Sequence, residues 1–179
     1  DGTHTFDVKA IDNSGNTGSA ASYSWLVDTT DPTVSISDTP AAETNSQAAD
    51  VTVTSADEND GSGLASTTCT IDAAATTCGD ALAALAEGSH TYVATATDNA
   101  GNSASDSYTW LIDTVNPTVS LADTPDAETT STAADFTVTS ADASSGLAST
   151  TCDLDGAAQA DCGGVLSSLA DGSHTFTAT

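Results

Sequence analysis

The chain repeats itself with a period of 85 residues, and this repeat limits the folds open to it. Thr33-Val-Ser-Ile36 returns as Thr118-Val-Ser-Leu121, and Trp25-Leu-Val-Asp28 returns as Trp110-Leu-Ile-Asp113. Such a period is the size of one small sandwich domain and is too long for a solenoid repeat. We therefore expect small tandem modules rather than one large domain.

Alternating side chains within the repeat predict short β-strands. Ser89 to Thr97 and Asp106 to Ile112 alternate β-branched or aromatic residues with small polar ones, which is typical of half-buried strands. The turn-forming run Asp98 to Asn102 joins them into a hairpin. Five further strands are predicted at Thr33 to Ser37, Asp50 to Ala56, Thr67 to Asp72, just before Cys78, and Ala81 to Leu85. Asp80 to Ala86 could instead form a helical turn. Short, evenly spaced strands without a long helical stretch predict that the fold class is all-β and antiparallel.

The repeat predicts one complete module and two partial ones. Residues 30–114 hold all seven strands, whereas residues 1–29 hold only the last hairpin of a preceding or neighbouring module. Residues 115–179 form a module that lacks its last strand. The sequence contains no Met and opens without a charged and apolar leader, so we expect an internal piece of a longer, processed chain.

The charge balance excludes several classes of partner. The formal net charge is −25, and Lys9 is the only Lys or Arg residue. Nucleic acids and anionic membrane surfaces both require a basic footprint, so neither is an expected partner. No apolar run approaches the roughly 18 residues of a membrane span, so direct membrane insertion is not expected either.

The four cysteines form one close pair in each repeat: Cys69 with Cys78 and Cys152 with Cys162. Four cysteines allow three pairings, and the repetition favours disulfides within each repeat. Disulfides indicate an oxidising compartment, here extracellular or at the cell surface. A zinc site is the rival interpretation, but the chain has no C-x-x-C spacing and its histidines lie elsewhere in the repeat.

Several motifs follow one another in a fixed order. They are Cys152-Asp-Leu-Asp-Gly156, Leu169-Ala-Asp-Gly-Ser-His-Thr-Phe176, Ala96-Thr-Asp-Asn-Ala-Gly-Asn102 and Trp110-Leu-Ile-Asp-Thr114. Together they resemble the bacterial immunoglobulin-like (Big-type) repeats of large secreted or surface-anchored proteins, adhesins among them. The resemblance implies tandem antiparallel immunoglobulin-like β-sandwiches that serve as a stalk or spacer, sometimes as an adhesive tip, and it brings no catalytic residues. One departure is Ala73, where the second copy has Gly156, so the resemblance does not predict the conformation of the turn after Asp72.

The histidines invite a catalytic interpretation, but they obey the repeat. His4, His90 and His174 each follow an acidic residue and Gly, and each precedes an aromatic residue by two positions. A residue that recurs in every module at a sheet corner is a scaffold feature. No nucleophile elbow or triad spacing accompanies them, so we expect no enzyme activity.

Carboxylates gather in the loops that an immunoglobulin-like topology brings to one pole of the complete module. The candidate ligands there are Asp28, Asp31, Asp57, Asp60, Asp98 and Asn102. Converging carboxylate and amide oxygens suit calcium, which takes 6 to 8 oxygen ligands. The alternative is a solvated acidic surface of turn-forming residues, and no EF-hand signature is present.

Trp25 and Trp110 each close the last strand of a module. Their identical placement favours packing in the core or at a junction over a sugar-stacking platform.

A structural role is the function these features favour: a stalk, spacer or filament subunit of a secreted or cell-surface assembly. Its incomplete ends could be filled by copies of itself joined head to tail through strand complementation, or by covalent continuation of the chain. The alternative is an adhesive module for carbohydrate, ice or a cell surface. A binder should carry one divergent loop rich in aromatics, yet the largest difference between copies is two polar residues within Asp57 to Gly63.

Overall fold

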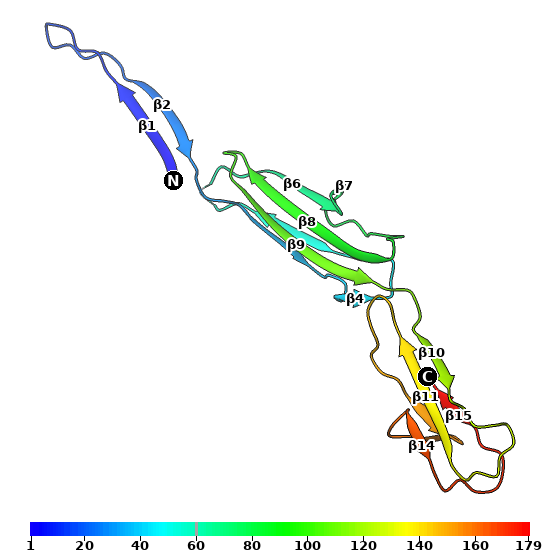
Figure 1. Ribbon diagram of the computed structural model, residues 1–179. Helices are drawn as coiled ribbons and strands as arrows, with labels where there is room; N and C mark the ends of the chain where they lie inside the picture. The colour runs from blue at the N-terminus through cyan, green and yellow to red at the C-terminus, as the bar shows by residue number, and fades with distance from the viewer. Residues whose placement is uncertain (60) are drawn as a thin grey trace. The chain divides into compact units, whose positions relative to one another are not determined.

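The computed structural model describes residues 1–59 and 61–179, and these residues form strands and turns without any helix. The all-β expectation is therefore confirmed. The chain divides into two compact units, Asp1–Ile112 and Asp113–Thr179, which are described separately (Figure 1).

The main sheet of the first unit has five strands in the order β4-β9-β8-β6-β7. Their bounds are β4 (Glu43–Thr44), β6 (Leu64–Ile71), β7 (Ala74–Thr76), β8 (Gly88–Asp98) and β9 (Ser103–Ile112). The long hairpin β8–β9 places Tyr92 opposite Tyr108 and His90 opposite Trp110. Every second residue of β8 is buried, because one face of the sheet is turned to the interior.

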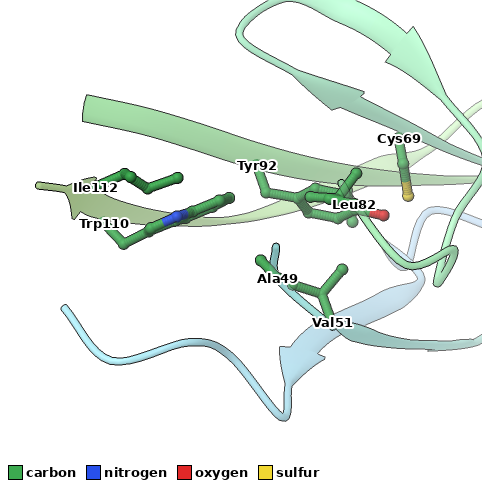
Figure 2. Packing of buried hydrophobic residues seen from close by; sticks show 8 residues of the cluster. Ala49, Val51, Cys69, Leu82, Tyr92, Trp110 and Ile112 are labelled. Carbon is green, nitrogen blue, oxygen red and sulfur yellow. The ribbon is translucent and has the colours of Figure 1, made fainter. Parts of the chain in front are cut away.

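A second sheet covers that interior. It consists of β3 (Thr33–Ser37) and β5 (Thr52–Ala56), paired antiparallel, and its Val34, Ile36 and Val53 pack against the core. The core itself contains Ala49, Val51, Cys69, Leu82, Tyr92, Ala94, Trp110 and Ile112, most of them labelled in Figure 2. Two sheets around one apolar layer fit a β-sandwich. Trp110 and Tyr92 are the largest fully buried side chains of this layer.

The first unit also carries a separate two-stranded sheet, β1 (Gly2–Val8) and β2 (Ala21–Val27). Its aromatic residues match those of β8–β9 in sequence, but they are exposed: Phe6 to 61%, Tyr23 to 69% and Trp25 to 42%. Trp110, by contrast, is exposed to only 1%. Core packing therefore holds for Trp110 and not for Trp25, because no second layer covers the aromatic face of the β1–β2 hairpin within the described residues.

The second unit repeats the first in outline. One sheet has the order β10-β11-β14 and the other β13-β12-β15. The bounds are β10 (Thr118–Ala122), β11 (Ala134–Ala141), β12 (Cys152–Leu154), β13 (Ala157–Ala158), β14 (Gly164–Leu166) and β15 (Phe176–Ala178). Phe136 and Phe176 stack with ring centroids 4.3 Å apart, at the positions of Val51 and Tyr92 in the first unit.

Two details differ from the sequence prediction. Ala81 to Leu85 forms neither a strand nor a helical turn, and only an isolated bridge joins Leu82 to Ala49. The two-residue strand β4 pairs with β9 in parallel, so the expectation of purely antiparallel sheets is wrong at this edge. A strand of two residues shows no alternation, and the sequence therefore gave no signal for it.

The turn after β6 is the same in both copies despite the change of residue. Asp72 and Ala73 have φ of 50° and 65°, and Asp155 and Gly156 have φ of 53° and 79°. Two consecutive residues with positive φ are typical of a tight hairpin turn. Ala73 thus adopts a left-handed conformation that glycine would adopt at lower cost.

Candidate functional site

Both disulfides lie within their repeats. Cys69 on β6 is bonded to Cys78, and Cys152 on β12 is bonded to Cys162, with sequence separations of 9 and 10 residues. The first members of both pairs are buried. Two disulfides in one small chain indicate an oxidising environment.

A histidine clip fastens the turn after β6 to the start of β8. His90 Nδ1 lies 2.7 Å from Asp72 Oδ2, and His90 Nε2 lies 2.8 Å from the carbonyl oxygen of Ala86. Asp72 Oδ1 accepts a hydrogen bond from the Thr91 amide at 2.9 Å. Both ring nitrogens face acceptors, so only the protonated imidazolium can donate to both at once.

The shifts in pKa agree with this geometry. The carbonyl of Ala86 raises the pKa of His90 above its ordinary value; burial opposes this shift, and Asp72 adds to it. The amide of Thr91, followed by His90, lowers the pKa of Asp72. The clip therefore favours a charged pair.

The same clip recurs in the second unit. His174 Nδ1 lies 2.7 Å from Asp155 Oδ2, and His174 Nε2 lies 2.8 Å from the carbonyl oxygen of Ala170. His4, the third equivalent histidine, stacks on Trp25 with ring centroids 5.7 Å apart. In both clips, the histidine atoms that could serve in catalysis are engaged in holding the turn.

Three carboxylates converge where the loops of the first unit meet the segment after β2. One oxygen each from Asp28, Asp57 and Asp98 lie within 4.8 Å of one another. Asp98 is exposed to only 2% and Asp28 to 9%. We call this set the acidic pole.

Backbone amides of the surrounding loops hold these carboxylates in place. Asp98 Oδ1 accepts hydrogen bonds from the amides of Gly101 and Asn102 at 2.6 and 2.8 Å. Asp28 Oδ2 accepts one from the Ser62 amide at 2.7 Å, and Asp57 Oδ2 accepts one from the Gly63 amide at 2.6 Å. Hydrogen bonds, first those from Ser62, lower the pKa of Asp28, so this group is held in its charged form.

One oxygen of the acidic pole lacks the partner that burial demands. Asp57 Oδ1 is buried and accepts no hydrogen bond. Lys9 is the only Lys or Arg of the chain, and it lies on the β1–β2 hairpin. Ligand oxygens at 2.3 to 2.6 Å from a calcium ion lie up to about 5 Å from one another, so the carboxylate spacing fits that ion.

Two acids beside the acidic pole extend the negative charge. Oxygens of Asp1, Asp28 and Glu58 also lie within 4.8 Å of one another. The backbone amide of Glu58 donates to its own carboxylate and lowers its pKa, but a hydrogen bond with Asp57, burial, and the charges of Asp57 and Asp28 outweigh it, and the pKa of Glu58 is raised. The negative charge gathered at this edge therefore favours the protonated form of Glu58.

The structure brings some of the predicted ligands together and separates others. Asp28, Asp57 and Asp98 meet, and Asn102 donates from Nδ2 to Asp98 Oδ2 at 2.8 Å, so Asn102 orients a carboxylate. Asp31 is exposed and outside the set, and Asp60 lies outside the described residues.

Sequence reasoning missed Asp1 as a member of this region. The pairing of Gly2 with Val27 places Asp1 beside Asp28, and Asp1 accepts hydrogen bonds from Thr29 and Thr30. The antiparallel hairpin predicted for residues 1–29 was the signal that could have revealed this proximity.

The second unit has part of the same arrangement. Asp113 accepts hydrogen bonds from the amide and hydroxyl of Ser145, and Asp142 accepts one from the Gly146 amide at 2.8 Å. Residues 113–179 include no equivalent of Asp98.

Residues 1–59 and 61–179 contain no helix that could cross a membrane. No protein-family model matches the chain, and a comparison with curated proteins finds no match to it.

Proposed function

We propose that the chain is a run of tandem immunoglobulin-like β-sandwich modules that act outside the cell as a stalk, spacer or filament subunit of a secreted or cell-surface assembly. One observation carries the proposal: equivalent histidine and aspartate side chains hold the same turn in both units. The three hydrogen-bond distances of the His90 clip and of the His174 clip differ by no more than 0.1 Å.

Repeated contacts of this kind support a mechanical role. A site for binding or catalysis places its distinctive chemistry at one location, whereas these residues are used again in each module. Each module also carries a disulfide that closes a short loop beside its core. Cross-links and charged clips that fix turns raise the rigidity of a small sandwich, and rigidity is the property that a spacer requires.

We further propose that the acidic pole binds calcium. Asp28, Asp57 and Asp98 would hold the ion, and Asn102 would keep Asp98 oriented toward it. The buried, unpartnered Asp57 Oδ1 supports this assignment, because a cation would satisfy that oxygen. When bound, the ion would neutralise the mutual repulsion of carboxylates and tie the segment after β2 to the loops of the complete module.

Differential scanning calorimetry with calcium and with chelator tests this proposal. We expect calcium to raise the melting temperature of the full chain, and Asp98→Asn to abolish the rise. Asp80→Asn, which removes an exposed carboxylate from another loop, is the matched control and should keep it. An equal melting temperature with calcium and with chelator would show that the acidic pole binds no calcium and that the loop amides alone hold its carboxylates.

An adhesive role is the alternative, and the exposed Tyr23 and Trp25 give it a specific basis. Their rings stack with centroids 6.1 Å apart on the open face of the β1–β2 hairpin. A glycan array probed with the labelled chain distinguishes the two roles. Specific binding that is lost in Trp25→Ser would favour adhesion, and its absence leaves the structural role as the better account.

A further inference from the structure

The chain enters the sandwich of the first unit beside one end of β9 and leaves it from the other end. Asn102, which precedes β9, donates from Nδ2 to the carbonyl oxygen of Asp28 at 3.2 Å, and β3 begins soon after at Thr33. β9 then runs over Ser103–Ile112, where the chain leaves the sandwich. A strand of ten residues is roughly 33 Å long, so a pull along the chain acts on the sandwich from its two ends.

The segment that enters, residues 33–44, runs along β9 in the same direction; we call it the entering segment. At its end, β4 pairs with β9 in parallel (Figure 1). The residues at which the two segments meet advance together from one end of the sandwich to the other. In order, they are Ile36 with Asp106, Pro40 with Tyr108, Ala42 with Leu111 and Thr44 with Ile112. The parallel alignment therefore extends well beyond the two residues of β4.

Two side chains of β9 make hydrogen bonds to the backbone of the entering segment. Asp106 Oδ2 accepts one from the Ile36 amide at 2.9 Å, and Tyr108 Oη donates one to the carbonyl oxygen of Pro40 at 2.7 Å. The Ser107 amide holds the other oxygen of Asp106, Oδ1, at 2.8 Å. Both bonds to the entering segment are partly buried, so water competes with them less than it does at the surface.

The direction of the two segments decides how these bonds are loaded. Tension on the chain pulls the entering segment toward its beginning and β9 toward its end. Because the segments are parallel, tension slides one along the other and loads all the bonds between them at once. A pair of strands that is pulled from neighbouring ends instead opens one bond at a time. Bonds loaded together resist a larger force, since several must break in the same step.

We propose that Asp106 and Tyr108, together with the β4–β9 pairing, form a mechanical clamp that keeps the sandwich of the first unit closed under tension. This inference rests on the proposed role as a stalk or spacer, because only a chain that carries load between two points uses such a clamp. The Cys69–Cys78 disulfide and the His90 clip fasten β6 and β8, and they lie outside the loaded pair of segments. They stabilise the fold, whereas the clamp sets the force at which it opens.

Single-molecule force spectroscopy of the full chain, held by its two ends, tests the clamp. The measurement is made in chelator, so that a cation at the acidic pole does not contribute. The extension released in each step identifies the sandwich: it corresponds to residues 33–112 less the loop that the Cys69–Cys78 disulfide keeps closed. Forced unfolding is governed by the unfolding rate, which is measured at constant force.

Two variants each remove one bond of the clamp. Tyr108→Phe keeps the ring and loses the hydroxyl that reaches Pro40, and Asp106→Ala leaves the Ile36 amide without its acceptor. Because one partly buried hydrogen bond fewer resists the pull, we expect each variant to raise the unfolding rate at constant force by about fivefold or more.

Ser55→Ala is the matched control. Ser55 Oγ and Thr67 Oγ1 lie 2.7 Å apart in a hydrogen bond that is also partly buried, but it joins β5 to β6 and neither strand belongs to the loaded pair. We expect Ser55→Ala to lower the melting temperature as Tyr108→Phe does, and to leave the unfolding rate under force nearly unchanged. Equal effects of the two variants on that rate would overturn the proposal.

A change of pulling direction tests the geometry without altering the clamp. Ala100 is exposed in the turn between β8 and β9, at the end where the chain enters. An azide-bearing residue at position 100 provides an attachment point, and a pull between it and the beginning of the chain peels the entering segment away bond by bond. We expect the sandwich to open at a lower force than when the chain is held by its two ends.

Equal opening forces in the two directions would also overturn the proposal. This comparison keeps Asp106 and Tyr108, so it decides the question even where a clamp variant does not fold. Calcium-dependent melting and glycan binding are separate measurements made without force. Failure of the clamp is therefore distinguishable from failure of the proposed function.

Discussion

Raising the pH from about 5.5 to about 8.5 should weaken the complete module, because this range removes a proton from His90. The folded state raises the pKa of His90 above its ordinary value of 6.5. The stability gained from the protonated clip is therefore fully present below that ordinary value and is lost as the pH rises through the folded pKa. The lowered pKa of Asp72 acts in the opposite direction and only in acid, below its ordinary value of 3.8, so it does not change in this window.

The two hydrogen bonds of the clip set the size of the effect. A hydrogen bond to a charged group contributes about 1.5 to 3 kcal/mol when buried, and an exposed ion pair about 1 kcal/mol or less. The His90 side chain is 8% exposed but that of Asp72 is 47% exposed, so we place the loss in the lower part of the range. The expected decrease in the free energy of unfolding is about 1 to 2 kcal/mol, or a fall in melting temperature on the order of 5 °C.

Thermal unfolding followed by Trp110 fluorescence, in a Trp25→Phe background, reports on the complete module alone, since the chain has two tryptophans. Asp72→Asn keeps the turn but removes the charge, so we expect it to flatten the pH dependence. Asp155→Asn alters only the clip of the second unit and should leave the Trp110 transition unchanged. The same pH dependence in Asp72→Asn and the unaltered chain would refute the reasoning.

Two further predictions concern the turn and the cross-link of the same module. Ala73→Gly should raise the free energy of unfolding by about 1 kcal/mol, because glycine adopts positive φ without strain, and Gly156→Ala should lower it in the second unit. Chemical denaturation measures both; a destabilised Ala73→Gly variant would contradict the explanation. Replacing Cys69 and Cys78 together by Ala should lower the stability of the unfolding transition reported by Trp110 by about 2 to 3 kcal/mol through the freed loop. Reduction of the unaltered chain also breaks the Cys152–Cys162 bond, but it should shift the Trp110 transition by the same amount.

The sequence by itself determined the strands whose alternation is regular. Thr33–Ser37 appears within its predicted bounds, and β8–β9 extends the predicted hairpin by a few residues at its turn. The period of 85 residues indicated which residues are equivalent, and His90 and His174, equivalent by that period, make the same contacts. Local alternation and turn chemistry are properties of neighbouring residues, and they can be read before folding.

Contacts between distant segments were decided only by the tertiary structure. The parallel pairing of β4 with β9, the approach of Asp1 to Asp28, and the difference between buried Trp110 and exposed Trp25 all depend on which segments meet in space. Trp25 and Trp110 have nearly the same sequence neighbours, yet only Trp110 has a second sheet packed over it. Burial depends on what covers a side chain, and for residues far apart in the sequence that is settled by packing alone.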